Sequence, residues 1–455
     1  MTDNQDFEHA SARGPPYDRA PMATFLLMML AAPPALHEHA FRLERAAEAV
    51  AVVRATCPGC DWGTPGREAA VLALSVDGAL HQHLVLTRGA SGEYRVLLGA
   101  LAAGEHTLAL ALDRKLSARG AREARVESVA IEAVAEGEPG YEALAHAPIL
   151  HTRKHTLARF SDVPLVAWVE SHAAPEAGRE LRYSIVFSNE DGGTPLDRLM
   201  ATWGRATDIE LVYSVQLDAA GGVRAATFQG KDHITARFAG RREGSHPVLY
   251  VVTENNMVKD SGPATPRVAL APRPFALEGV SREAVMDAEP WTYRLSQQEV
   301  RREGRVAKGA RAGSKRIPDP GRFVFLEACG RVSDARLAFD VGLAGASGGL
   351  QWYASDAGRP AFRVARAGCF RAAAALPEGK GIADVRALRL RAHTRPPRKG
   401  EKPLAPGSGS ARIDRVNRLF GLGADDMPAT SVFEWTAGAD ITPDGPPLEL
   451  LLTPR

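Results

Sequence analysis

The sequence predicts an all-β protein of tandem, jelly-roll-like β-sandwich domains joined by Gly/Pro-rich and basic linkers. Three observations lead to this fold class. Short apolar runs, such as residues 69–76 and 106–112, alternate or run apolar over strand-like lengths. Gly and Asp turn signals separate these runs, and long amphipathic helical patterns are few. At 455 residues the chain is too long for one hydrophobic core, so several domains are expected.

Composition and charge exclude some classes of protein. The chain is 45% hydrophobic and 24% charged, which is ordinary for a globular protein, so long disordered regions are not expected. Its 56 Lys and Arg nearly balance 54 Asp and Glu, for a formal net charge of +2. Dedicated nucleic-acid binders carry a strong basic excess, so nucleic acid is not an expected partner.

Residues 1–35 are predicted to be a leader that contains a signal peptide. Its apolar run, residues 23–32, has the length of a signal-peptide core and is shorter than the roughly 20 residues of a membrane-spanning helix. Ala32 and Ala35 are the expected cleavage positions, and a buried N-terminal helix is the alternative interpretation. No other segment is long and apolar enough to span a bilayer, so an extracellular or periplasmic location is expected.

The four cysteines, an even number, fit an oxidising compartment. We predict two local disulfides, one between Cys57 and Cys60 and one between Cys329 and Cys369. Free structural thiols are the main alternative. The first pair also has the spacing of a redox motif, but no βαβ pattern surrounds it, and a zinc site would need a second pair at close spacing.

The N-terminal domain is expected at residues 45–135 as a small β-sandwich. Within it, residues 98–108 look like the penultimate hairpin of jelly-roll carbohydrate-binding modules. A Gly/Pro/Glu linker at residues 136–140 then leads into a central β-sandwich at residues 147–300.

A basic segment at residues 301–317 is predicted to be a solvated linker, because Gly and Ala fill the gaps between its charges without apolar periodicity. The last domain, residues 318–455, again has the pattern of short strands. Residues 394–409 are rich in Pro and Gly and are expected to form a long loop in that domain.

Acidic side chains are expected to gather at one edge of the central sandwich. Asp208 and Glu210 lie at i and i+2, so both carboxylates point to one face of a strand. Glu190 and Asp191 end the preceding strand. Such a cluster binds a hard cation through oxygen ligands, or else its members repel one another and share a proton. Asp191, Asp208 and Glu210 are therefore candidate ligands for Ca²⁺ or Mg²⁺, and no other cofactor is expected.

Further polar residues at strand ends and loops complete the predicted ligand site. Its members are Glu190, Asp191, Arg205, Asp208, Glu210, His233, His246, Asn255 and Asn256. The same residue types are those that turns and solvated sheet rims require, so a purely structural role stays open. No catalytic residue is assigned.

The central domain resembles the necrosis- and ethylene-inducing-like protein family and the related fungal vacuolar-sorting-associated sandwich family. Residues 204–210 align without a gap on the first family's glycine-histidine-arginine-histidine-aspartate-tryptophan-glutamate heptapeptide, with identity at Gly204, Asp208 and Glu210. Residues 183–187, followed by Glu190 and Asp191, are similar to the strand that delivers its acidic metal ligand.

The resemblance implies a two-sheet sandwich with a polar rim and recognition of a glycan or a glycolipid headgroup. Both heptapeptide histidines are absent, and Arg205 and Thr207 stand in their places. Arg205 occupies a ligand position of the family, where a guanidinium cannot bind a metal. It is instead able to neutralise the carboxylates, and cytolytic activity does not carry over.

These observations favour an exported binding protein over an enzyme. In this hypothesis the central sandwich holds the ligand, and a polysaccharide or surface glycoconjugate is the expected partner. The alternative is a secreted metal-dependent or acid–base hydrolase or lyase that acts on a polymer, with Asp208, Glu210 and a histidine as its acid–base groups.

Overall fold

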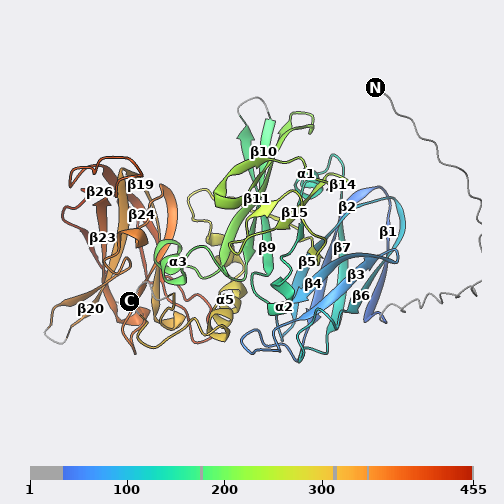
Figure 1. Cartoon of the computed structure of the whole chain (residues 1–455), viewed down its shortest axis with the longest axis horizontal. Coiled ribbons are helices and arrows are strands. Elements are labelled where there is room, and N and C mark those ends of the chain that lie inside the picture. Colours follow the sequence, from blue (N-terminus) through green and yellow to red (C-terminus); the bar gives the residue numbers. More distant parts are fainter. Residues whose placement is uncertain (1–33, 175–177, 311–314, 346–347, 453–455) are drawn as a thin grey trace, which may run out of the picture. The chain divides into compact units, whose positions relative to one another are not determined.

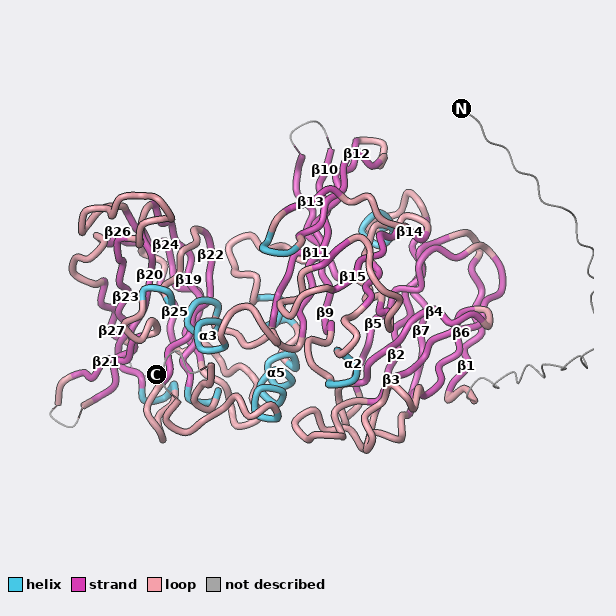
Figure 2. Tube along the Cα trace, in the orientation of Figure 1, coloured by secondary structure: helices cyan, strands magenta, loops and turns pink. Residues whose placement is uncertain are grey.

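The structure is a computed structural model that describes residues 34–174, 178–310, 315–345 and 348–452. The predicted signal peptide lies outside the described residues. Strands dominate the described chain (Figure 2), which confirms the all-β fold class. From Ala35 onward the chain forms one compact unit. Among the described residues, no helix combines the length and apolar character needed to cross a membrane.

The N-terminal sandwich consists of two antiparallel sheets with strand orders β1-β6-β3-β4 and β5-β2-β7. Side chains from both sheets fill its core, because every second residue of each strand points inward. Figure 1 shows these strands in blue and cyan. The strands are β1 (His37–Leu43), β2 (Ala47–Thr56), β3 (Ala70–Val76), β4 (Ala79–Leu86), β5 (Gly92–Leu101), β6 (Gly104–Leu112) and β7 (Arg125–Ala135).

The central sandwich packs a sheet of order β13-β12-β11-β10-β9-β18 against a sheet of order β14-β15-β8-β17, with β16 paired to β15. Buried aromatic residues such as Tyr183 and Tyr213 fill its core. Its strands are β8 (Ile149–His151), β9 (Pro164–Ala174), β10 (Gly178–Phe187), β11 (Asp208–Asp218), β12 (Val223–Gln229), β13 (Thr235–Arg237), β14 (Arg242–Glu243), β15 (His246–Val251), β16 (Val258–Lys259), β17 (Arg267–Val268) and β18 (Arg273–Pro274).

The C-terminal sandwich has sheets of order β22-β19-β24-β25 and β21-β20-β23-β27, with β26 paired to β24. The predicted Pro/Gly-rich loop is the connection between β23 and β24. The strands are β19 (Phe323–Ser333), β20 (Ala335–Ala344), β21 (Leu350–Ala354), β22 (Gly368–Ala375), β23 (Val385–Thr394), β24 (Ser410–Phe420), β25 (Phe433–Trp435), β26 (Ala439–Ile441) and β27 (Leu448–Leu451).

Three helices contribute to a further apolar cluster that joins the central and C-terminal sandwiches. They are α3 (Leu196–Trp203), α4 (Ala284–Ala288) and α5 (Trp291–Arg302). Their apolar side chains pack with Trp168 of β9 on one side and with Phe325 and Phe420 of the C-terminal sandwich on the other. The remaining helices are α1 (Tyr141–Ala145), α2 (Thr156–Arg159), η1 (Lys231–His233), η2 (Pro320–Arg322), η3 (Pro360–Phe362) and η4 (Ile382–Asp384).

The prediction of a solvated basic linker is wrong for its first two residues. Arg301 and Arg302 end helix α5. Arg301 pairs with Asp319 and Asp426, at N–O distances of 3.1 and 2.5 Å. Arg302 donates hydrogen bonds to backbone carbonyls instead. These basic side chains are used as structural contacts, because a guanidinium satisfies several acceptors at once. The other predicted domain boundaries stay predictions.

Both predicted disulfides are present. Cys57 is bonded to Cys60 in the loop that follows β2, and Cys329 is bonded to Cys369. Cys329 and Cys369 are direct partners in the antiparallel register of β19 and β22, so the second disulfide links adjacent strands of one sheet. The described cysteines include no free thiol.

Candidate functional site

Three carboxyl groups meet where the two middle strands of the six-stranded sheet of the central sandwich end and begin. Strands β10 and β11 are antiparallel neighbours, with Phe187 opposite Asp208 and Ile185 opposite Glu210. The end of β10 and the start of β11 therefore lie side by side. Glu190 follows β10 closely and comes near Asp208, as the sequence predicted. We call Glu190, Asp208 and Glu210 the carboxyl cluster.

The carboxyl cluster is largely buried. Asp208 is 1% exposed, Glu190 5% and Glu210 7%. Asp208 and Glu210 share one face of β11, and the backbone N–H of Ile209 donates a hydrogen bond to Asp208 Oδ1 at 2.9 Å. The amide of Asn256 also donates to Asp208, at 3.0 Å. Asp208 is thus held by neutral donors as well as by charge.

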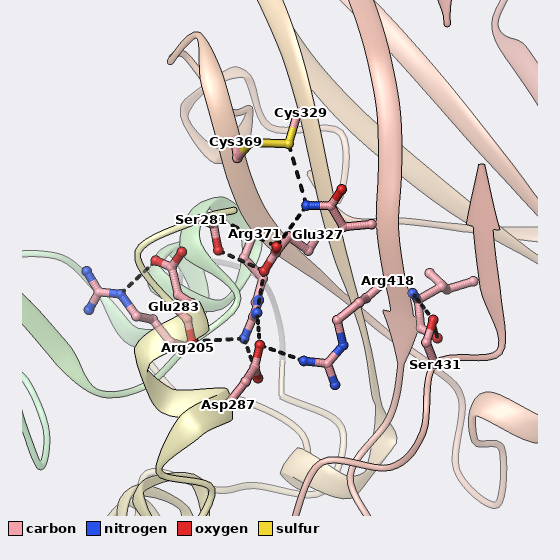
Figure 3. A network of polar contacts seen from close by, with 12 residues as sticks. Arg205, Ser281, Glu283, Asp287, Glu327, Cys329, Cys369, Arg371, Arg418 and Ser431 are labelled. Atoms are coloured by element: carbon pink, nitrogen blue, oxygen red, sulfur yellow. Dashed lines mark hydrogen bonds and ion pairs between the residues drawn. A yellow bond between two sulfur atoms is a disulfide. The ribbon is translucent and has the colours of Figure 1, made fainter. Parts of the chain in front are cut away.

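Arg205 is the cation closest to the cluster, but Glu283 shares its charge. Its Nη1 lies 3.7 Å from Asp208 Oδ1, and its Nε lies 3.2 Å from Glu283 Oε1. Figure 3 shows this second contact, in which the Arg205 side chain points toward Glu283 at the start of α4. One guanidinium therefore faces carboxyl groups on two sides and does not neutralise the whole cluster.

Burial and crowding change how these carboxyl groups hold protons. The pKa of Glu190 is raised from 4.5 to about 7, first by burial and then by the neighbouring Asp208. The pKa of Glu210 is raised well above its ordinary value by the same two causes. Burial also raises the pKa of Asp208, against the opposing effects of Arg205 and Asn256. Near pH 7, Glu190 is consequently present in both its protonated and its ionised form.

Asp191 does not join the carboxyl cluster as a metal ligand, which corrects the predicted metal site. Its carboxylate pairs with Arg153 at 2.6 Å and accepts a hydrogen bond from Ser161. Burial would raise the pKa of Asp191, but these two partners outweigh burial and lower it. Within the described residues, no group of three or more His, Cys, Asp or Glu side chains is arranged to hold a metal ion.

His233 lies beside the cluster at the surface. Its side chain is 58% exposed, and its Nδ1 lies 4.0 Å from Glu210 Oε2. The Gln229 amide contacts the same nitrogen at 2.8 Å. His233 therefore forms the solvent-exposed side of the site next to the buried Glu210.

Asn255 and Asn256 also reach the site. Asn256 is buried and adopts a left-handed backbone with φ of 54°, which places its amide on Asp208. Gly193 fits between Glu190 and Asn255, where an added Cβ would lie 2.5 Å from Glu190 Oε1 and 2.9 Å from Asn255 Cβ. The loop after β10 and the loop after β15 therefore close together over Glu190.

His246 lies elsewhere, which corrects its place in the predicted ligand site. Its Nε2 lies 3.0 Å from Glu48 Oε2 in β2, and its Nδ1 lies 3.0 Å from the Ala147 carbonyl. It lines a cavity of ≈ 220 Å³ together with His81 of β4. The partner of His246 comes from the N-terminal sandwich, so its position in β15 alone could not show this contact.

Sequence reasoning missed two arginines at the site. Arg282 is exposed, donates to the Ile209 carbonyl at 2.9 Å and lowers the pKa of Glu210 against the larger effect of burial. Arg305 donates to the Glu190 carbonyl at 3.2 Å. Both follow the cluster by more than 70 residues, and no local pattern links them to it. The buried side-chain oxygens of Asn189 and Asn256 find no hydrogen-bond partner in the described chain.

Whether a divalent cation fits the cluster is a testable question. The guanidinium of Arg205 stands beside Asp208 where a third ligand would be needed, and Asp191 is engaged by Arg153. The residues present thus do not fit Ca²⁺ or Mg²⁺. We expect neither ion to raise the melting temperature of the wild type or of an Asp208→Asn/Glu210→Gln variant. Ligand at 100 times its Kd would stabilise by about 2.7 kcal/mol, so a rise confined to the wild type would contradict this expectation.

Comparisons with known proteins give weak likenesses only. No family model matches the chain, and no curated protein matches it. Among solved structures, NLPPya in complex with mannosamine matches at 12% identity and a TM-score of 0.23, over 30% of this chain and 74% of that one. A Paenibacillus sp. cycloisomaltooligosaccharide glucanotransferase complexed with cycloisomaltoheptaose matches at 12% identity and a TM-score of 0.17. That match covers 51% of this chain but only 39% of the glucanotransferase, and no family is assigned on these likenesses.

Proposed function

We propose that this chain is an exported binding protein that recognises a polysaccharide or a surface glycoconjugate through its central sandwich. The observation that carries the proposal is the carboxyl cluster, in which three largely buried carboxyl groups lie together and the nearest guanidinium, that of Arg205, is shared with Glu283. Burying such groups costs stability unless they gain partners. A site that keeps this arrangement at the end of a sheet is a candidate for ligand binding.

The chemistry of the cluster suits a ligand rich in hydroxyl groups. A hydroxyl both donates and accepts hydrogen bonds, and neighbouring hydroxyls of a sugar need both kinds of partner. Near pH 7 the Glu190 carboxyl is available both as a protonated donor and as an ionised acceptor. The exposed side chains of His233 and Arg282 add further donors at its solvent side.

Export is supported by the two disulfides, because disulfides persist in oxidising compartments and are rare in the cytosol. The loop bond of the N-terminal sandwich joins cysteines 3 residues apart, and the cross-strand bond of the C-terminal sandwich joins cysteines 40 residues apart. Their presence fits a protein that works outside the reducing cytosol.

The direct test is binding to a panel of immobilised neutral polysaccharides by the wild type and a Glu210→Gln variant. An ordinary hydrogen bond contributes about 0.5–1.5 kcal/mol, so we expect the variant to bind about two- to tenfold more weakly. Glu434→Gln is the matched control, because it removes one exposed carboxylate in β25 of the C-terminal sandwich. The proposal would be contradicted if the wild type bound none of the polysaccharides. It would also be contradicted if Glu210→Gln bound them as tightly as the wild type.

A second candidate is hydrolysis or elimination at the same site. The specific observation in its favour is the pKa of Glu190, which at about 7 suits a general acid working near neutral pH. Incubating the wild type with the same polysaccharides and assaying for cleavage products distinguishes the two functions. Release of reducing ends or of unsaturated sugar ends by the wild type, lost in Glu190→Gln, would assign the chain to the second candidate.

A further inference from the structure

The C-terminal sandwich contains a second polar cavity, of ≈ 360 Å³. It lies where β20 begins and where the loop after β23 begins. Its walls include Asp334, Arg336, Ala365, Arg395, Pro397 and Arg398. We call it the arginine cavity. Its volume is in the lower part of the roughly 300–1,000 Å³ that small-molecule sites span.

One of the three arginines is already neutralised. Arg395 Nε pairs with Asp334 at 2.7 Å, and its two terminal nitrogens pair with the Glu401 carboxylate at 2.6 Å. These contacts fix the start of the loop that follows β23. Arg395 therefore builds the wall of the cavity. With Arg336 and Arg398 added, three arginines stand against the two carboxylates of Asp334 and Glu401, which leaves a formal charge of +1 (3 − 2).

Arg336 and Arg398 carry charges without an acidic partner. Arg336 Nη1 donates to the Pro360 carbonyl at 3.2 Å. Across the described residues, no carboxylate lies within ion-pair distance of either guanidinium. The pKa of Arg336 is lowered by burial and then by the positive charges of Arg198, Arg363 and Arg395. An anion placed beside Arg336 would meet a guanidinium whose side-chain hydrogen bond goes to a backbone carbonyl and not to a carboxylate.

We infer that the arginine cavity binds the anionic group of an acidic polysaccharide, a uronate carboxylate or a sulfate ester. A planar guanidinium forms two parallel hydrogen bonds with such an oxyanion. Pro396, Pro397 and Ala365 give the cavity an apolar side on which a sugar ring can rest. The formal net charge of the chain is only +2, so strong attraction of polyanions by the molecule as a whole is not expected.

This inference rests on the proposed function in taking a glycan as the ligand, and it names the class of that glycan. The carboxyl cluster contacts hydroxyl groups in that proposal, and the arginine cavity would contact charges along the same polymer. Two sites on one chain raise the overall affinity for a polymer through effective concentration.

The experiment measures binding of the full chain to polygalacturonate, dextran sulfate and uncharged dextran at one fixed ionic strength. We expect one or both polyanions to bind more tightly than dextran. The carboxylate polymer and the sulfate polymer separately report which oxyanion the cavity prefers. Arg336→Gln and Arg398→Gln should each weaken polyanion binding at least about tenfold. Arg398 is exposed, so its variant tests the site even if Arg336→Gln disturbs folding.

Arg114→Gln is the matched control, because it removes one exposed arginine from the N-terminal sandwich and changes the net charge equally. We expect it to bind like the wild type. An equal loss in Arg114→Gln, or no loss in either cavity variant, would overturn the inference, because the attraction would then be general. Single-stranded DNA that binds as tightly as the polyanions and depends equally on Arg336 would also overturn it.

The two proposals fail separately. Glu210→Gln weakens binding of neutral polysaccharides if the proposed function holds, and the Arg336 variant weakens only the response to charge. If Arg336→Gln binds neutral glycans and polyanions as the wild type does, only the arginine-cavity inference is contradicted. If polyanion binding depends on Arg336 but Glu210→Gln leaves the binding of neutral glycans unchanged, only the carboxyl-cluster proposal is contradicted.

Discussion

Replacement of Arg371 by methionine is expected to lower the free energy of unfolding by about 3–5 kcal/mol. Arg371 lies in β22 and is 0% exposed. Its guanidinium pairs with Asp287 at 2.6 Å and with Glu327, and it also contacts the Tyr293 hydroxyl. Figure 3 shows this side chain between the two carboxylates, one on α4 and one on β19.

The large effect follows from the carboxylates that the substitution would leave behind. Asp287 would keep Arg418, at 2.5 Å. Glu327 would keep hydrogen bonds from Ser281 and Asn417 but no ion pair with any described residue. A buried carboxylate without a cation is costly, even when neutral donors remain.

Denaturant unfolding at neutral pH measures this effect. Arg42→Met is the matched control, because it removes a solvent-exposed pair with Glu105, and we expect its unfolding free energy to stay close to that of the wild type. A second variant, Arg371→Met/Glu327→Gln, should be more stable than Arg371→Met alone, because the orphaned charge is gone. A loss below about 1 kcal/mol for Arg371→Met would show that the network does not hold the two sandwiches together.

The sequence predicted those parts of the molecule that follow from local pattern. Period-two alternation identified the β-sandwiches, and the close spacing of Cys57 and Cys60 identified one disulfide. Asp208 and Glu210 share a face because they are two residues apart on a strand. Glu190 lies beside them because consecutive antiparallel strands meet at their connected ends.

Long-range partners decided the parts that could not be predicted. Asp191 is next to Glu190 in the chain, but its carboxylate forms an ion pair with Arg153 from an earlier segment and does not join the carboxyl cluster. His246 contacts Glu48 of the N-terminal sandwich, which lies 198 residues earlier in the sequence. Helix α5 was missed because polar residues, among them Gln297 and Glu299, occupy part of its buried face and hide its apolar period.

The stability of the folded chain is expected to decrease as pH rises from about 4.5 to 7, in part because of Glu190. Its pKa is 4.5 in an unfolded chain and about 7 in the folded one, so the folded state binds the proton more tightly. Protonation therefore stabilises the fold, fully below the unfolded pKa and not at all above the folded one. The difference in pKa corresponds to about 3 kcal/mol.

The pH dependence of wild-type stability does not report on Glu190 alone, because burial also raises the pKa of Glu299 to about 7. Glu190→Gln separates the two. Glutamine still accepts the hydrogen bond from the Thr194 amide, which lies 2.6 Å from Glu190 Oε1, and it carries no charge to bury. Unfolding free energies should therefore agree for wild type and variant near pH 4, and the variant should be more stable by about 3 kcal/mol near pH 8. The exposed control variant Glu434→Gln should have the same unfolding free energy as the wild type at every pH. If Glu190→Gln is less stable than the wild type near pH 8, the ionised Glu190 carboxylate is well paired in the folded state and the prediction is wrong.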